Sequence, residues 1–220
     1  MDPKVFQEAA FGESSFFENL SESKRYTLQQ VTIEKNTVLH VALQFKNFKA
    51  AESIVKSIPS LVYEVNSKGN TPLHVAAMVG DSSLVKQLIK HAKELGVETG
   101  GRQLLSKVNL DGDTALHVAV RYGSNNKLEI VTELIKEDQE LAKHENNAGE
   151  SALFLAVDRQ LYKMALHILT TAPDSCSYAG RHGMNVLHAL VIHTSTCKCC
   201  PILLLKYMGS VCYAYTPQSN

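Results

Sequence analysis

Four histidines occupy the same place in a recurring seven-residue motif: His40, His74, His117 and His188. Histidine can act as a general acid or base near neutral pH, or bind a metal through an imidazole nitrogen. The spacing, however, places one histidine in each copy of the motif. Because buried polar groups in proteins usually have hydrogen-bond partners, we interpret the four histidines as structural residues.

A second group of possible metal ligands lies near the carboxyl end: His188, His193, Cys197, Cys199 and Cys200. Zinc sites usually combine two regularly spaced pairs of ligands, and this Cys-x-Cys-Cys run has no second matching pair. We favour a disordered tail with free thiols over a metal site, with acylation of the cysteines as an alternative if the tail touches a membrane. All five cysteines lie in the last quarter of the chain, in an odd number. This distribution favours a reducing compartment over a disulfide framework.

Catalytic motifs such as G-x-S-x-G, a phosphate-binding glycine loop or H-E-x-x-H do not occur in the sequence. We therefore expect a protein that is not an enzyme and that binds no cofactor. The 220 residues include 22 basic and 22 acidic side chains, which argues against a nucleic-acid binder with a basic stripe. Lys86, Lys90 and Lys93 fall on one side of a predicted helix. We interpret them as a solvated face, with a patch for anionic lipid as the alternative.

The recurring motif predicts the architecture. Five copies begin at Asn36, Asn70, Asp113, Glu150 and Met184. Equivalent positions are 34 to 43 residues apart. A period of this size indicates a solenoid of stacked helical pairs, in which neighbouring repeats bury one another's apolar faces.

The residue types at the positions of the motif can be explained by the structure that they favour. The second position, as in Thr71, Thr114 and Ser151, holds residues that cap the N-terminus of a helix. The leucine two positions later is expected to be buried. Gly80 and Gly123 are expected to end their helices in a left-handed conformation.

The rest of each repeat predicts a second helix and a turn. Paired apolar residues four apart, as in Leu84-Val85 and Leu88-Ile89, predict the second helix. Asn-x-x-Gly sequences before each cap predict hairpin tips. Three departures are visible: Lys35 replaces the glycine of the first turn, Phe154 replaces a motif histidine, and Leu190 replaces a small alanine. We expect Lys35 to distort its hairpin and Leu190 to hinder close packing of helices.

The segment Thr71-Pro72-Leu73-His74-Val75-Ala76 matches the ankyrin signature T-P-L-H-x-A in full, and four further copies are in register. The chain is identified as a member of the ankyrin-repeat family over about residues 5–196. The resemblance implies an all-α solenoid of helix-turn-helix units joined by β-hairpin-like turns, with a structural hydrogen-bonding role for the four histidines. The expected units are a degenerate N-terminal capping repeat (1–31), repeat 1 (32–65), repeat 2 with a long insertion (66–108), repeat 3 (109–145), repeat 4 (146–179), a partial repeat 5 (180–196) and an irregular Cys-rich tail (197–220).

A narrower resemblance rests on residues 112–123 and 146–156, on the Met1-Asp2-Pro3 opening and on the long second repeat. These segments resemble plant ankyrin proteins of the accelerated-cell-death type, which combine a cytosolic ankyrin array with membrane helices. The resemblance implies a protein-interaction module of plant defence or cell-death signalling, in the cytoplasm or at the cytosolic face of the plasma membrane. The alternative is the cytosolic portion of a membrane signalling or transport protein. In either case we expect membrane contact only through a longer isoform or acylation of the tail.

Ankyrin arrays bind proteins through their hairpin tips and the exposed side of their inner helices, and no nucleic-acid partner is expected. The resemblance implies contact positions on the concave face at Ser67, Lys68, Asn70, Met78, Val79, Leu110, Asp111, Asp113, Arg121, Tyr122, Asn147, Glu150, Asp158 and Arg159. Arg121 and Tyr122 are the favoured hot spots, because Arg and Tyr are enriched there. We expect changing both to Ala to weaken partner binding and leave the fold intact. Phe45, Met78, Val79 and Tyr122 form either an apolar concave stripe or packing between repeats.

Overall fold

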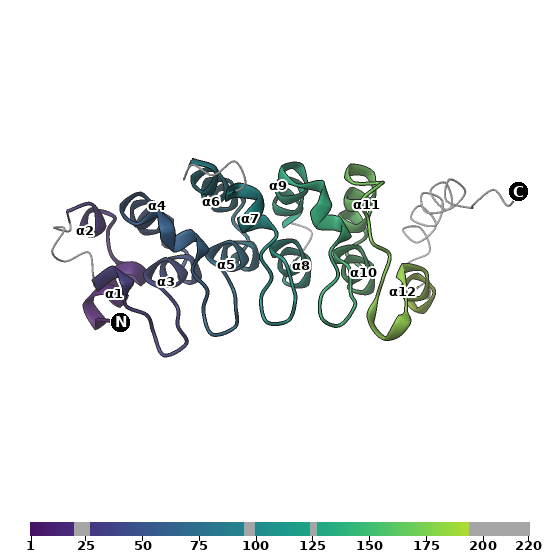
Figure 1. The fold of residues 1–220 in the computed structure, drawn as a ribbon, viewed down its shortest axis with the longest axis horizontal. Helices are drawn as coiled ribbons and strands as arrows, with labels where there is room; N and C mark the ends of the chain where they lie inside the picture. Colours follow the sequence, from purple (N-terminus) through teal and green to yellow (C-terminus); the bar gives the residue numbers. More distant parts are fainter. Residues whose placement is uncertain (20–26, 95–99, 124–126, 194–220) are drawn as a thin grey trace, which may run out of the picture.

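A computed structural model of the chain describes residues 1–19, 27–94, 100–123 and 127–193. Within these ranges the helices form two parallel rows, and hairpin loops project from one side (Figure 1). The described residues contain no β-strand, only two isolated β-bridges. The predicted all-α solenoid is therefore confirmed.

The inner row lies next to the hairpins, and each of its helices packs against the next one. It consists of α1 (Pro3–Phe11), α3 (Val38–Gln44), α5 (Pro72–Val79), α8 (Ala115–Arg121), α10 (Ala152–Asp158) and α12 (Val186–His193). The outer row consists of α2 (Ser15–Glu18), α4 (Phe48–Ser57), α6 (Ser82–Glu94), α9 (Leu128–Glu137) and α11 (Tyr162–Thr171), with α7 (Gly100–Leu105) added after α6. Short 3-10 turns are η2 (Pro59–Tyr63), η4 (Gln139–Lys143) and η5 (Arg181–Gly183).

The predicted N-caps are confirmed. The side chain of Thr71 accepts a hydrogen bond from the backbone N–H of His74, and the His74 ring accepts one from the backbone N–H of Thr71. Gly80 ends α5 in the left-handed conformation, with φ of 96°. The prediction for Gly123 is wrong, because it is not among the residues with positive φ. A Cβ atom there would lie 2.7 Å from the Ala119 carbonyl oxygen, so the position needs glycine for space.

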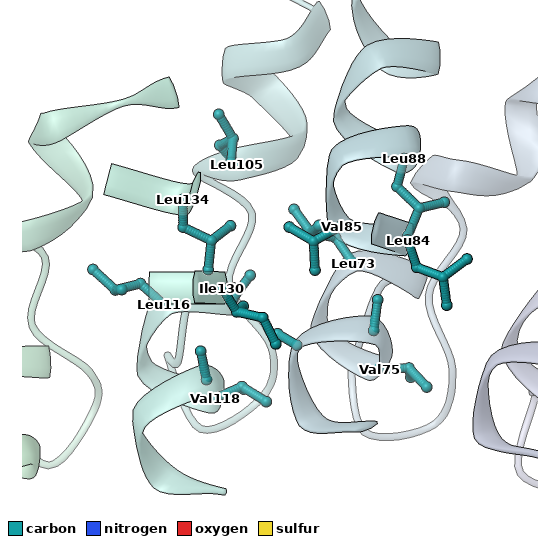
Figure 2. Close-up of a cluster of buried hydrophobic side chains, with 14 of the residues drawn as sticks. Leu73, Val75, Leu84, Val85, Leu88, Leu105, Leu116, Val118, Ile130 and Leu134 are labelled. Atoms are coloured by element: carbon teal, nitrogen blue, oxygen red, sulfur yellow. The ribbon is translucent and has the colours of Figure 1, made fainter. Parts of the chain in front are cut away.

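Leucines of the inner helices and apolar residues of the outer helices form the core. Figure 2 shows Leu73 and Leu116 from the inner row together with Val85, Ile130 and Leu134 from the outer row. All five side chains are buried. Burial of this kind supplies the main driving force that holds neighbouring repeats together.

Two predictions for residues of α12 are wrong. Leu187 occupies the position of Leu116 but is 39% exposed, so the expected burial is wrong there. Leu190 is fully buried and α12 packs directly on α10. The larger side chain therefore does not prevent α12 from packing on α10.

The first hairpin is regular, so its predicted distortion is wrong. Lys35 adopts φ of 56°, close to the 73° of Gly69 at the same place in the next hairpin. The closing hydrogen bonds match as well: Thr32 N to Asn36 O is 3.0 Å, and Asn66 N to Asn70 O is 3.1 Å. The repeat architecture thus imposes a left-handed conformation on a lysine, although such a conformation is unfavourable for non-glycine residues.

The lysines on α6 contact the neighbouring repeat. Lys86 pairs with Glu133 at 3.2 Å, and Lys93 pairs with Glu137, both on α9. These ion pairs support the solvated-face interpretation. None of the helices in the described ranges combines the length and the apolar composition needed to cross a bilayer.

Candidate protein-binding groove

The hairpin tips form a continuous row held by backbone hydrogen bonds. The second residue of each tip donates its N–H to the third residue of the preceding tip. The N···O distances are 2.8 Å from Ser67 to Glu34, 3.0 Å from Leu110 to Lys68 and 2.9 Å from Asn147 to Asp111. The tips are therefore fixed relative to one another, which reduces the entropy lost when a partner binds them.

A buried or half-buried asparagine stabilises each of the second, third and fourth tips from inside. Asn109 accepts hydrogen bonds on Oδ1 from the backbone N–H groups of Asp111 and Asp113, at 2.9 and 3.0 Å. Its Nδ2 donates to Asn70 Oδ1 of the preceding hairpin at 2.9 Å. Asn66 and Asn146 make equivalent contacts. This is a local Asx-type turn combined with a link between repeats.

A groove of about 420 Å³ lies between these tips and the inner helices α5 and α8. We call it the inner groove. Its lining includes the predicted contact residues Ser67, Lys68, Asn70, Met78, Leu110, Asp111, Asp113, Arg121 and Tyr122, together with Glu34 and Gln44. Leu110 is 70% exposed and Tyr122 53% exposed. The groove thus combines an aromatic ring and an apolar tip with exposed charges of both signs.

Two predicted contact residues in this region are buried, which corrects the expectation that their side chains are free for binding. Asp113 and Glu150 each have almost no exposed surface. Arg121 lies between them: its Nε is 2.8 Å from Asp113 Oδ2, and its Nη2 is 3.3 Å from Glu150 Oε2. Asn146 Nδ2 donates to both carboxylates. The three charged groups therefore hold the third repeat against the fourth.

Both buried carboxyl groups remain ionised. Burial by itself raises the pKa of Asp113, but hydrogen bonds from Arg121 and Asn146 outweigh it, and the pKa lies below its ordinary value. The same holds for Glu150, where burial is outweighed by hydrogen bonds from Arg181 and Asn146. Hydrogen bonding to the charged form is a general cause of such lowering.

The ionic network continues into the last repeat, a feature that the sequence analysis missed. Arg181 contacts Glu150 Oε1 at 2.9 Å and Asp158 Oδ2 at 3.0 Å. Its guanidinium also lies over the ring of Phe154, 5.5 Å from the centroid. Phe154 is buried at the place where other repeats carry histidine. The only signal in the sequence was an arginine in a hairpin tip, which does not identify partners in the preceding repeat.

The repeat histidines bridge successive repeats. The Nε2 atoms of His40, His74 and His117 lie 2.9, 3.0 and 3.1 Å from the carbonyl oxygens of Asn70, Asp113 and Glu150, respectively. Because Nδ1 of each ring accepts from a backbone N–H, the proton of the neutral ring belongs on Nε2, which then donates to the carbonyl.

Burial lowers the pKa of His40 and His74 to about 4 and also lowers that of His117. A neutral ring is what this bridging arrangement requires. His188 is exposed, and among the described residues it bonds only to Asn185 of its own repeat. These histidines lie in separate repeats, and the described ranges hold no cluster of possible metal ligands.

Other predicted contact residues lie outside the lining of the inner groove. Val79 is partly buried, while Asn147 and Arg159 are exposed. Asp158 is tied to Arg181. Phe45 contacts Phe6 and Phe11 and is not in the lining of the inner groove, which includes Met78 and Tyr122. Cys197, Cys199 and Cys200 lie outside the described residues.

One contact near the groove had no signal in the sequence. Lys127 Nζ donates to the carbonyl oxygens of Met78 at 2.8 Å and Tyr122 at 3.0 Å, at the ends of α5 and α8. A cation at helix C-termini complements the helix dipole. It fixes the positions of the two helix ends that border the groove.

Comparison with known proteins agrees with this architecture. The family described as "Ankyrin repeats (3 copies)" matches residues 6–99, 39–137 and 98–177. The chain belongs to the ankyrin-repeat family. Ankyrin repeats are protein-interaction modules, so this array is a protein-interaction scaffold, of a family that is typically non-catalytic.

Two curated relatives are much longer than the segment that matches this chain. Over 179 residues, 80% of its length, the array is 28% identical to "Protein ACCELERATED CELL DEATH 6" of Arabidopsis thaliana, of which it covers 27%. Over 62 residues, 28% of its length, it is 34% identical to "Leucine-rich repeat serine/threonine-protein kinase 1" of Caenorhabditis elegans, of which it covers 3%. The array thus spans about a quarter of the first relative and far less of the second.

Proposed function

We propose that this chain is a non-catalytic scaffold of plant defence or cell-death signalling that binds a protein partner in the inner groove. The observation that carries the proposal is the combination of exposed Leu110 and Tyr122 with a rigid base of hydrogen-bonded tips. The likeness to the Arabidopsis protein named for accelerated cell death supports the signalling context. We place the scaffold in the cytoplasm or at the cytosolic face of the plasma membrane.

The geometry of the groove supports a specific choice of contact residues. Leu110 supplies apolar surface at a hairpin tip, and Tyr122 supplies it at the end of α8. Lys68 and Asp111, at the hairpin tips, supply opposite charges. Aromatic anchors surrounded by polar groups are typical of binding hot spots. Arg121 acts by holding the floor of the groove, since its side chain is engaged by Asp113 and Glu150.

Quantitative pull-downs from plant tissue test the proposal. The full chain is compared with Tyr122→Ala and Lys68→Glu, and with Lys90→Ala on the exposed outer face as the matched control. We expect at least one protein to be retained by the parent chain and by Lys90→Ala and lost with both groove variants. If every captured protein binds all four chains equally, the inner groove is not the binding site.

A second candidate function is the cytosolic ankyrin portion of a plasma-membrane signalling or transport protein. The chain covers only 27% of the Arabidopsis relative, and this favours the second candidate. Fractionation of native tissue with an antibody to residues 66–160 separates the two candidates. A soluble product of this chain's size supports a free scaffold, whereas a larger product found only in membranes supports the second candidate.

A further inference from the structure

Large apolar side chains are exposed together where the array begins. Phe11 is 72% exposed, Phe45 is 44% exposed, and Ile33 at the first hairpin tip is fully exposed. The Phe45 ring packs edge-on against Phe6 and Phe11, with centroids 5.8 and 4.9 Å apart. Contiguous exposed apolar surface of this kind marks interaction sites.

A hollow of about 600 Å³ opens beside these rings, between α1, the first hairpin and α3. We call it the N-terminal hollow. Phe6, Ile33, Val41 and Phe45 form its apolar wall. Among the described residues that line the hollow, Glu34 is the only one with a carboxylate side chain. Glu34 and Gln44 also line the inner groove. The two depressions therefore share a border and form one extended surface.

The charge at this border is negative. The other charged group that lines the hollow is the Met1 ammonium, which donates to the Val31 carbonyl oxygen at 2.8 Å. Glu34 accepts one hydrogen bond, from Asn36 Nδ2 at 3.3 Å, and forms no ion pair within the described ranges. Its carboxylate is therefore available to a cationic group.

The row of hairpin tips also has an open edge at the hollow. Ser67 donates its N–H to Glu34 O, and the later tips repeat this pattern. Ile33 occupies the equivalent position in the first tip, and its N–H bonds to nothing in the part of the chain that the structure describes. An extended chain can add to such an edge through its carbonyl groups, as in strand addition to a sheet.

We propose that the N-terminal hollow binds an extended segment of a partner protein that carries a large apolar side chain next to a lysine or arginine. The apolar side chain packs against Phe6, Ile33 and Phe45, and the basic residue pairs with Glu34. The segment's backbone accepts the N–H of Ile33. This inference rests on the proposed function, because it extends the same binding surface and defines the chemistry of the partner.

Peptide display tests the inference with the full 220-residue chain as bait. The matched variant is Ile33→Ser with Glu34→Lys, which gives the first tip the residues that Ser67 and Lys68 supply in the second. Both changed side chains are exposed, so we expect unchanged thermal melting. We expect the parent chain to select peptides with an apolar residue beside Lys or Arg, and the variant to bind them at least about tenfold more weakly.

Charge reversal provides the second readout. Replacing the basic residue of a selected peptide by Glu weakens binding to the parent chain, and Glu34→Lys alone restores it. Selected peptides that bind the double variant as tightly as the parent chain overturn the inference. If those peptides instead lose affinity for Tyr122→Ala, the proposed function stands and only this inference fails.

Two further outcomes are decisive. A library that yields no binder counts against both the inference and the proposed function. Concentration-dependent dimers of the parent chain in sedimentation, abolished by the double variant, assign the hollow to a second copy and overturn the inference.

Discussion

Arg121 Nε donates to Asp113 Oδ2 across 2.8 Å, and this pair joins the end of α8 to the cap region at its start. The same guanidinium reaches Glu150 of the next hairpin at 3.3 Å. Buried Asp113 is thus paired with Arg121, and buried Glu150 is paired with both Arg121 and Arg181. The contact between Arg121 and Glu150 links α8, which borders the inner groove, to the hairpin of the next repeat.

Arg121→Ala is expected to destabilise the protein, contrary to the expectation from sequence that changing both Arg121 and Tyr122 to Ala leaves the fold intact. The change removes the ion-pair partner of buried Asp113 and one of the two partners of buried Glu150. Breaking a buried pair costs about 3–5 kcal/mol, but the Arg121 side chain is 34% exposed. We therefore expect a loss of about 1–3 kcal/mol in the free energy of unfolding, measured by urea denaturation.

Arg159→Ala is the matched control, since Arg159 is exposed at the end of α10. Exposed substitutions usually change stability by less than about 0.5 kcal/mol. Equal midpoints for the two variants would show that the Arg121 network contributes nothing measurable.

Mild acid is expected to destabilise the array through its buried histidines. The pKa of His40 and His74 is about 4 in the folded protein and 6.5 in a free chain. Between these values the unfolded state binds more protons, so stability is present at neutral pH and decreases as pH falls from 6.5 towards 4. Each histidine contributes a slope of up to about 1.4 kcal/mol per pH unit.

Two measurements check this expectation. NMR titration of the ring protons gives the folded-state values directly, and midpoints near 6.5 would contradict it. The variant His74→Phe places at this position the residue type that the fourth repeat carries as Phe154. Its stability should decrease less steeply over the same pH range, because one titrating group has been removed.

A second loss of stability is expected at lower pH. The pKa values of Asp113 and Glu150 lie below their ordinary values of 3.8 and 4.5. Their contribution is therefore complete above about pH 4.5 and is lost as pH falls through the lowered values. Denaturation at a series of pH values should show this second decrease in the parent chain and a smaller one in Asp113→Asn.

Gly69→Ala is expected to destabilise the protein by about 1–3 kcal/mol. Gly69 has φ of 73°, which is unfavourable for alanine. In addition, a Cβ atom there would lie 2.8 Å from the backbone nitrogen of Leu110 in the next hairpin. Gly183→Ala is the control, because Gly183 has φ of 72° and nothing within 4 Å of the added atom. Equal losses would show that the contact between hairpins is unimportant.

Leu116→Ala and Leu187→Ala compare the same motif position in two repeats. Leu116 is fully buried, and its truncation is expected to cost about 2–5 kcal/mol. Leu187 is 39% exposed, and its truncation is expected to cost less than about 1 kcal/mol. Thermal or urea unfolding of both variants gives the comparison, and a similar cost at both positions would contradict it.

The sequence by itself determined the local elements. Thr71 predicted a cap, Gly80 predicted a left-handed helix end, and Leu84-Val85 predicted an apolar helix face. Each depends on residues within one or two turns of the chain, where sequence spacing and spatial distance are closely related. The fivefold recurrence then fixed the register of the repeats.

Only the tertiary structure decided which polar residues are exposed. Asp113 and Glu150 occupy hairpin positions that the repeat pattern assigned to contacts, yet Arg121 and Arg181 from neighbouring elements bury them in an ionic network. Lys35 adopts a glycine conformation because its hairpin belongs to the same row. The N-terminal hollow arises where α1 meets the first hairpin and α3. Apart from the Asp113–Arg121 pair, which lies within one repeat, these features depend on contacts between residues about 30 or more positions apart. The energies of such contacts are set by how the repeats stack and not by any local pattern.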